Sequence, residues 1–115
     1  MHEMSIAMSI VEIVNGELES LGITKNVEKI IFRAGILSAI VPQSLQFNFD
    51  ILKSQSERMK NATLEIIQVP LTIRCTECGD VSKPEIPAFV CPRCGKPVEI
   101  LEGHGMKVES VVVEE

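Results

Sequence analysis

The four cysteines of this chain stand in two turns of the same spacing, Cys75-Thr-Glu-Cys78-Gly79 and Cys91-Pro-Arg-Cys94-Gly95. A Cys-x-x-Cys turn brings two sulfurs to the same side of the backbone, and the following glycine lets the chain fold back beneath a bound metal. Two such turns supply four thiolates, the tetrahedral ligand set that Zn²⁺ prefers. The spacing therefore predicts one zinc site, with two disulfides or an iron centre as alternatives. Its ligands would be Cys75, Cys78, Cys91 and Cys94.

A zinc ion held by four cysteines has no open coordination position, so we expect it to stabilise the fold and not to react with a substrate. A redox role for the cysteines is disfavoured, because Cys-x-x-Cys pairs used in redox chemistry occur singly in a thioredoxin-like fold. The function of the chain is therefore expected to depend on other residues.

The tripeptide Met1-His2-Glu3 is the second candidate site. His2 is too large to favour removal of Met1, so we expect the α-amine of Met1 to be free. This amine, with a pKa of about 8, lies within chelating reach of the same ion as the amide nitrogen and imidazole of His2. The amide nitrogen or the carboxylate of Glu3 could complete a square-planar set, which suits Ni²⁺ or Cu²⁺. Alternatively, His2 and Glu3 only begin the first helix, where Glu3 is favourable at the positive end.

The composition argues against several classes of function. The 115 residues include 11 Lys and Arg against 16 Asp and Glu, and there is no Trp or Tyr, which disfavours nucleic-acid binding. No apolar run approaches the roughly 20 residues that cross a bilayer, and the N-terminus lacks the features of a signal peptide. Because metal-bound thiolates suit a reducing compartment, we expect a cytoplasmic protein.

The first half of the chain predicts two helices and one strand. Apolar residues at helical spacing over 4–21 indicate an amphipathic helix that Gly22 caps, with Met4 and Met8 as core residues. Alternation over 27–34 predicts a half-buried strand. Pro42 is suited to the first turn of a second helix. That helix would close at 54–56.

The second half predicts two strands around the cysteines. Residues 62–74 alternate with a change of phase, so we expect one long strand with a bulge or bend near 66–68 and an edge or turn at Pro70. After the turn at 103–105, the apolar segment 106–113 needs a sheet to join. The prediction is an α+β fold: a small three-stranded sheet with two helices, formed by 1–70 and 103–115, and an inserted zinc-ribbon module over 71–102.

The chain also resembles the HypA/HybF family of hydrogenase nickel-incorporation proteins. The resemblance covers almost the whole chain and is carried by Met1-His2-Glu3-Met4-Ser5, Val41-Pro42-Gln43-Ser44-Leu45, Phe49-Asp50 and the paired cysteine turns. Members are two-domain metallochaperones, so the resemblance implies a nickel site at Met1, His2 and Glu3 and a zinc site at the four cysteines. The sequence departs from the family at Gly35-Ile36-Leu37, where Gly-Glu-Leu is common. The loss of that glutamate puts in doubt any partner contact that it would make, but it puts neither metal site in doubt.

The resemblance implies a nickel metallochaperone for NiFe-hydrogenase that transfers Ni²⁺ and is not an enzyme. Its implied partners are the nickel-handling GTPase HypB and the hydrogenase large subunit, with no nucleic acid or membrane, and the chain would be a monomer or weak homodimer. His104, between two glycines, is interpreted as an exposed turn residue and not a nickel ligand. The alternative hypothesis is a zinc-ribbon interaction module of the transcription or translation machinery without a second metal.

Overall fold

The computed structural model describes residues 3–84 and 89–115, which form two compact units. The first unit comprises Met1–Arg33, Ile40–Ile67 and Lys107–Glu115, and the second comprises Ala34–Ala39 and Gln68–Met106. The elements in chain order are α1 (Glu3–Ser20), β1 (Val27–Gly35), the 3₁₀ turn η1 (Ile36–Ser38), α2 (Pro42–Lys53), β2 (Thr63–Val69), β3 (Thr72–Cys75), β4 (Val81–Ser82), β5 (Val98–Glu102) and β6 (Met106–Val113).

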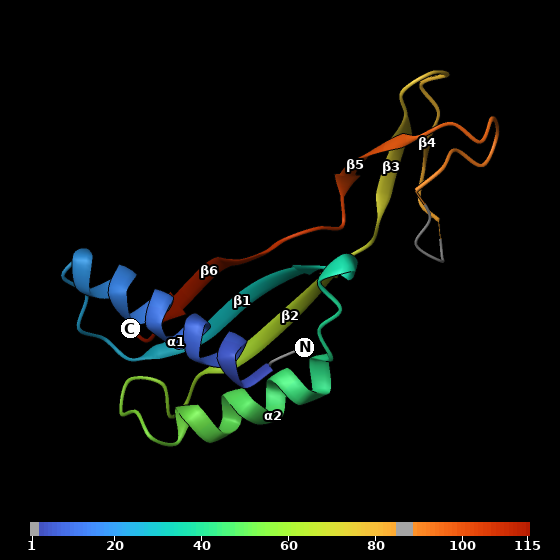
Figure 1. Ribbon diagram of the computed structural model, residues 1–115. Coiled ribbons are helices and arrows are strands. Elements are labelled where there is room, and N and C mark those ends of the chain that lie inside the picture. The colour runs from blue at the N-terminus through green and yellow to red at the C-terminus, as the bar shows by residue number, and fades with distance from the viewer. Residues whose placement is uncertain (1–2, 85–88) are drawn as a thin grey trace. The chain divides into compact units, whose positions relative to one another are not determined.

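The first unit is built on a three-stranded sheet of order β2-β1-β6, and both long helices lie on the same face of it (Figure 1). Strand β6 runs antiparallel to β1 (Figure 1). At one end of this pair, the Glu114 N–H donates to the Asn26 carbonyl at 2.9 Å. The prediction that segment 106–113 returns to the sheet of the N-terminal half is therefore confirmed, and so is the α+β fold class.

Helix α1 packs against α2 and the sheet through one narrow stripe. Its buried side chains recur every three or four residues, as expected for the apolar face of a helix. The helix ends as Gly22 predicts, because the Ile23 N–H donates to the Leu18 carbonyl at 2.9 Å in a Schellman arrangement. The apolar core of this unit includes Ala7, Ile10, Val14 and Leu18 of α1, Ile30 and Phe32 of β1, and Leu45 and Phe49 of α2.

The prediction that Met4 and Met8 pack in the core is wrong. These side chains are 37% and 48% exposed, on a face of α1 beside the buried stripe. The first half of α1 is apolar nearly all round, so its periodicity could not show which apolar residues meet the sheet.

The second unit contains a sheet of order β4-β3-β5 with antiparallel pairing, in which Arg74 lies opposite Val81 on one side and Glu99 on the other. The prediction of one long strand over 62–74 is wrong, because β2 ends at Val69 and β3 begins at Thr72 in a different sheet. Pro70 lies at the break, where it cannot donate a ladder hydrogen bond. The change of phase in the sequence thus marks a passage between two sheets, each with its own buried face.

Gly35 and Gly103 of the second unit approach each other too closely for side chains. The Gly35 N–H donates to the Gly105 carbonyl and the Leu37 N–H donates to the Gly103 carbonyl, each at 2.9 Å. A Cβ atom on Gly35 would overlap the Gly103 carbonyl group and lie 2.5 Å from the His104 nitrogen. All of these atoms belong to the backbone, so no side-chain movement can relieve the clash.

Replacement of Gly35 by alanine should therefore destabilise the protein by about 1–3 kcal/mol, the usual cost of overpacking. Gly16→Ala is the matched control, because Gly16 lies within α1 and nothing is within 4 Å of the added methyl group. That control should stabilise the protein by about 0.5–1 kcal/mol. Urea unfolding of both variants measures the difference, and equal midpoints would contradict the close packing at Gly35.

Candidate metal centre

The two cysteine turns have the same backbone geometry. In the first, the Gly79 N–H donates to the Cys75 carbonyl at 3.1 Å, and in the second the Gly95 N–H donates to the Cys91 carbonyl at 2.8 Å. Both glycines have positive φ angles, +75° and +71°, which side chains with a Cβ atom rarely adopt. The glycine at the fifth position of each turn is thus required by the backbone conformation, as the sequence predicts.

Each turn is also closed by a backbone hydrogen bond from its first cysteine to a residue just beyond the turn. The Cys75 N–H donates to the Asp80 carbonyl at 2.9 Å, and the Cys91 N–H donates to the Lys96 carbonyl at 2.8 Å. Cys75 is also the last residue of β3, which places the first turn on the central strand of its sheet. In both turns the first cysteine is buried and the second is exposed.

These turns bring all four sulfurs to one point, where their Sγ atoms lie within 4.8 Å of one another. The separation is 3.5 Å between Cys75 and Cys94 and 3.8 Å between Cys78 and Cys91. A tetrahedral ion with metal–sulfur bonds of about 2.3 Å places its sulfurs about 3.8 Å apart, whereas a disulfide joins them at about 2.05 Å. All four cysteines are free, so the geometry fits a metal site and not two disulfides.

Backbone N–H groups donate to two of the four sulfurs and so favour their negatively charged thiolate form. The N–H groups of Cys78 and Glu77 each donate to the Cys75 sulfur at 3.4 Å, and the Arg93 N–H donates to the Cys91 sulfur at the same distance. The Cys78 N–H is the main cause that lowers the pKa of Cys75 to about 6.

The fourth thiol is harder to ionise. The Lys96 N–H favours the Cys94 thiolate, but the neighbouring Cys75 thiol, burial and the Cys91 thiol outweigh it and raise the pKa of Cys94 to about 12. The cluster alone therefore cannot carry four negative charges near neutral pH. A bound dication reverses this balance, because a coordinating thiol is deprotonated outright.

At the N-terminus, Met1 and His2 lie outside the described residues, and Glu3 is the first residue described. Glu3 begins α1 and is only 9% exposed. Its Oε2 atom accepts a hydrogen bond of 3.1 Å from the backbone N–H of Val41, the residue that precedes α2. The carboxylate thus links the N-terminal ends of the two helices.

This contact lowers the pKa of the Glu3 carboxyl, chiefly because the Val41 N–H stabilises its charged form. A carboxyl whose pKa is lowered by folding stabilises the native state at neutral pH, and that stability is lost as the pH falls through the lowered value. Sequence analysis missed this role of Glu3. The available signal was that Val41, before Pro42, has no side-chain acceptor to cap α2.

His104 is exposed between Gly103 and Gly105, in agreement with its interpretation as a turn residue. It lies in the second unit, as do the four cysteines, whereas Glu3 belongs to the first. Among residues 3–84 and 89–115, no helix is long and apolar enough to cross a bilayer.

Comparison with known proteins agrees with these features. The sequence model of the family described as "Hydrogenase/urease nickel incorporation, metallochaperone, hypA" matches residues 1–113. The chain is 40% identical over 116 residues to hydrogenase maturation factor HypA of Desulfosudis oleivorans, covering 100% of both chains. It is 36% identical to the factor of the same name from Chloroflexus aggregans, covering 99% of this chain and 98% of that one.

The fold also resembles a solved structure. The solution structure of the Ni metallochaperone HypA from Helicobacter pylori superposes with a TM-score of 0.70 at 25% identity, covering 98% of this chain and 97% of that one. Taken with the match over residues 1–113, this shows that the chain belongs to the HypA family of nickel metallochaperones for hydrogenase maturation.

Replacing Cys78 by serine should remove the metal from the cysteine cluster, because three thiolates cannot offset the ordering of so short a segment. Elemental analysis should find about one zinc per chain before the change and none after it. Glu77→Ala is the control, since it alters the same turn but leaves all four sulfurs and the Glu77 N–H in place. A metal-free native protein with two disulfides would show the zinc assignment to be wrong.

Proposed function

We propose that this chain binds Ni²⁺ through Met1, His2 and Glu3 and delivers it for the maturation of NiFe-hydrogenase. One structural Zn²⁺ would be held by Cys75, Cys78, Cys91 and Cys94. The observation that carries the proposal is the family match over residues 1–113, which include the tripeptide and all four cysteines. The sulfur geometry supports the zinc assignment independently of the family.

The contact of Glu3 favours one of the two ligand sets left open by the sequence. The Glu3 carboxylate is nearly buried and its Oε2 atom accepts the hydrogen bond from Val41, so an ion bound through that atom would break the contact. The Glu3 amide nitrogen can coordinate without disturbing the carboxylate. We therefore propose a four-nitrogen, square-planar site formed by the Met1 amine, the amide and imidazole of His2, and the Glu3 amide, which suits Ni²⁺.

The proposed activity is transfer by ligand exchange and not catalysis. A site at the end of the chain requires few other bonds to break when the ion leaves. Micromolar affinity, which corresponds to about −8 kcal/mol, would hold the ion yet permit its release. A closed zinc site of four sulfurs contributes shape to the second unit and takes no part in the transfer.

The proposed partners are the nickel-handling GTPase HypB and the large subunit of NiFe-hydrogenase. The family's part in hydrogenase maturation supports partner proteins of this kind. With a net charge of −5 and no Trp or Tyr, the chain offers little to nucleic acid. We place the protein in the cytoplasm, as a monomer or weak homodimer, with 71–102 as its zinc domain.

Replacement of His2 by alanine should abolish stoichiometric nickel binding, because the amine and amides alone lack an anchor. A loss of about a hundredfold in affinity, about 2.8 kcal/mol, is expected by isothermal titration. Residues added before Met1 should have the same effect, since they convert the amine into an amide. Binding should also weaken from pH 7.5 to pH 6, as protons compete for the imidazole (pKa about 6.5) and the amine (pKa about 8).

Zinc content and melting temperature serve as controls in that experiment, because both should be unchanged in every form. Equal nickel affinity in the wild type, the His2→Ala variant and the extended form would contradict the N-terminal site. The family assignment would stand in that case, but the ligands would have to be sought elsewhere.

Glu3→Gln distinguishes the amide from the carboxylate as the fourth ligand. The glutamine keeps the backbone amide and an oxygen that can accept the Val41 N–H, so nickel stoichiometry and affinity should be retained. A loss of more than about tenfold, about 1.4 kcal/mol, would show that the carboxylate coordinates the ion. An absorption spectrum of the nickel complex gives a second test, since a square-planar band should persist in the variant.

A further inference from the structure

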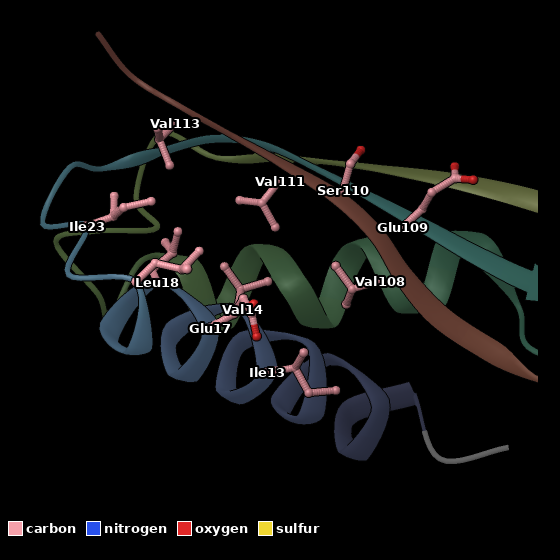
Figure 2. Close-up of a pocket in the computed structure, with 11 residues that line it drawn as sticks. Ile13, Val14, Glu17, Leu18, Ile23, Val108, Glu109, Ser110, Val111 and Val113 are labelled. Carbon is pink, nitrogen blue, oxygen red and sulfur yellow. The ribbon is translucent and has the colours of Figure 1, made fainter.

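An open groove of about 410 Å³ runs along β6 on the side of α1 (Figure 2). From β6, Val108, Val111 and Val113 point toward the helix, whereas Glu109 and Ser110 point away from it (Figure 2). The lining is mainly aliphatic, which is typical of a binding groove. Eleven residues line it: Ile13, Val14, Glu17, Leu18, Leu21, Ile23, Val108, Glu109, Ser110, Val111 and Val113.

The groove exists because the helical layer is wider than the sheet beneath it. Two helices packed 8–10 Å apart cover about 20 Å, whereas three strands spaced about 4.8 Å apart cover about 14 Å. Within the part of the chain that the structure describes, β6 is the outer strand on this side, so the backbone groups of its free edge have no sheet partner. The missing width corresponds to about one strand. Two residues that line the groove, Ile13 of α1 and Leu21 directly after this helix, are accordingly 57% and 63% exposed.

The charge of the groove indicates what could fill it. Neither Lys nor Arg occurs among the lining residues. Glu109 pairs with Arg33 at 3.3 Å, but Glu17, beside the valines, makes no ion pair within residues 3–84 and 89–115. A carboxylate at an apolar surface is stabilised when a cation pairs with it and water is excluded. The groove therefore complements an apolar segment that carries a positive charge at one position.

We propose that another protein adds an extended segment to the free edge of β6 as a fourth strand. Alternate side chains of this segment would be apolar and would fill the space beneath α1, and one Lys or Arg among them would pair with Glu17. Backbone hydrogen bonds to β6 would supply affinity, and the groove would supply specificity, as in other cases of strand addition. The proposal concerns a surface of the first unit and does not depend on nickel binding.

A second copy of this chain is a poorer occupant. The segment 106–115 contains Lys107 but also Glu109, Glu114 and Glu115. Pairing β6 with β6 of another copy would bring six carboxylates against two ammonium groups, and like charges in neighbouring strands are destabilising. The acidic edge thus favours a basic partner over self-association.

The test uses the full chain and a fluorescein-labelled synthetic peptide that can pair with β6. Threonine alternates along this peptide with the residues meant to face the groove, which are valine, then lysine, then valine. Binding is followed by fluorescence anisotropy. Glu17→Lys should weaken it by about tenfold or more, because it replaces attraction by repulsion. Glu12→Lys is the matched control: Glu12 is exposed on the same helix but lies outside the groove, and the control should bind like the wild type.

A second peptide with glutamate in place of the lysine should bind Glu17→Lys and not the wild type. Amide chemical shifts should change along β6 and at 13–21 when the first peptide binds. Three results would overturn the proposal: no binding of the lysine peptide, equal weakening by both substitutions, or a dimer by sedimentation whose shifts involve β6. The last result would show that a second copy covers the edge.

Discussion

Four sulfurs held within 4.8 Å of one another are the constraint on which the second unit depends. Its sheet has only short strands, of four, two and five residues, and little apolar surface to bury. Segments of this size usually need a metal or disulfides to fold. The cysteine turns are already bent correctly, with backbone N–H groups directed at Cys75 and Cys91. The coordination of a dication would thus do the work that a hydrophobic core does in the first unit.

The first unit depends on different physics. Its sheet and two helices bury aliphatic and aromatic side chains such as Ile10, Ile30 and Phe49. The carboxylate of Glu3 adds a polar link between the N-terminal ends of α1 and α2 through the Val41 N–H. The first residue of a helix is usually free to fray. The hydrogen bond of Glu3 instead holds the first residue of α1 in place, which is a useful property for a member of the proposed ligand set.

Sequence patterns predicted the elements that have local signals. The cap at Gly22, the start of α2 at Pro42 and the cysteine turns each depend on residues close in sequence, and the structure agrees with each of them. The misses concern contacts between distant segments. Periodicity could not show that Met4 and Met8 face outward, because the choice among apolar faces is made by α2 and the sheet. The change of phase over 62–74 was visible in the sequence. A bulge within one strand and a passage to a second sheet produce the same change in the alternation of apolar residues, so the sequence could not distinguish them.

The candidate site divides in the same way. The spacing alone indicated that Cys75, Cys78, Cys91 and Cys94 form one cluster. Both the ligand type and the turn geometry depend on residues that are adjacent in sequence. The partner of Glu3 was not predictable, since Val41 is distant in sequence and contributes only a backbone N–H, which every residue except proline possesses. The groove beside β6 arises only when helices and strands of unequal total width are stacked, so no stretch of sequence encodes it.

The two ends of α1 are therefore suited to different tasks. Glu3 lies at its first residue, and the groove begins at Ile13 and extends beyond its last turn. At a rise of about 1.5 Å per residue, the first residue of the helix is about 15 Å along the helix axis from Ile13 and over 20 Å from Glu17. A partner whose lysine or arginine paired with Glu17 would therefore contact α1 well away from Glu3. A carrier must bind its partner and release its metal ion in the same encounter. When the docking surface is separate from the nickel site, these two steps do not compete for the same residues.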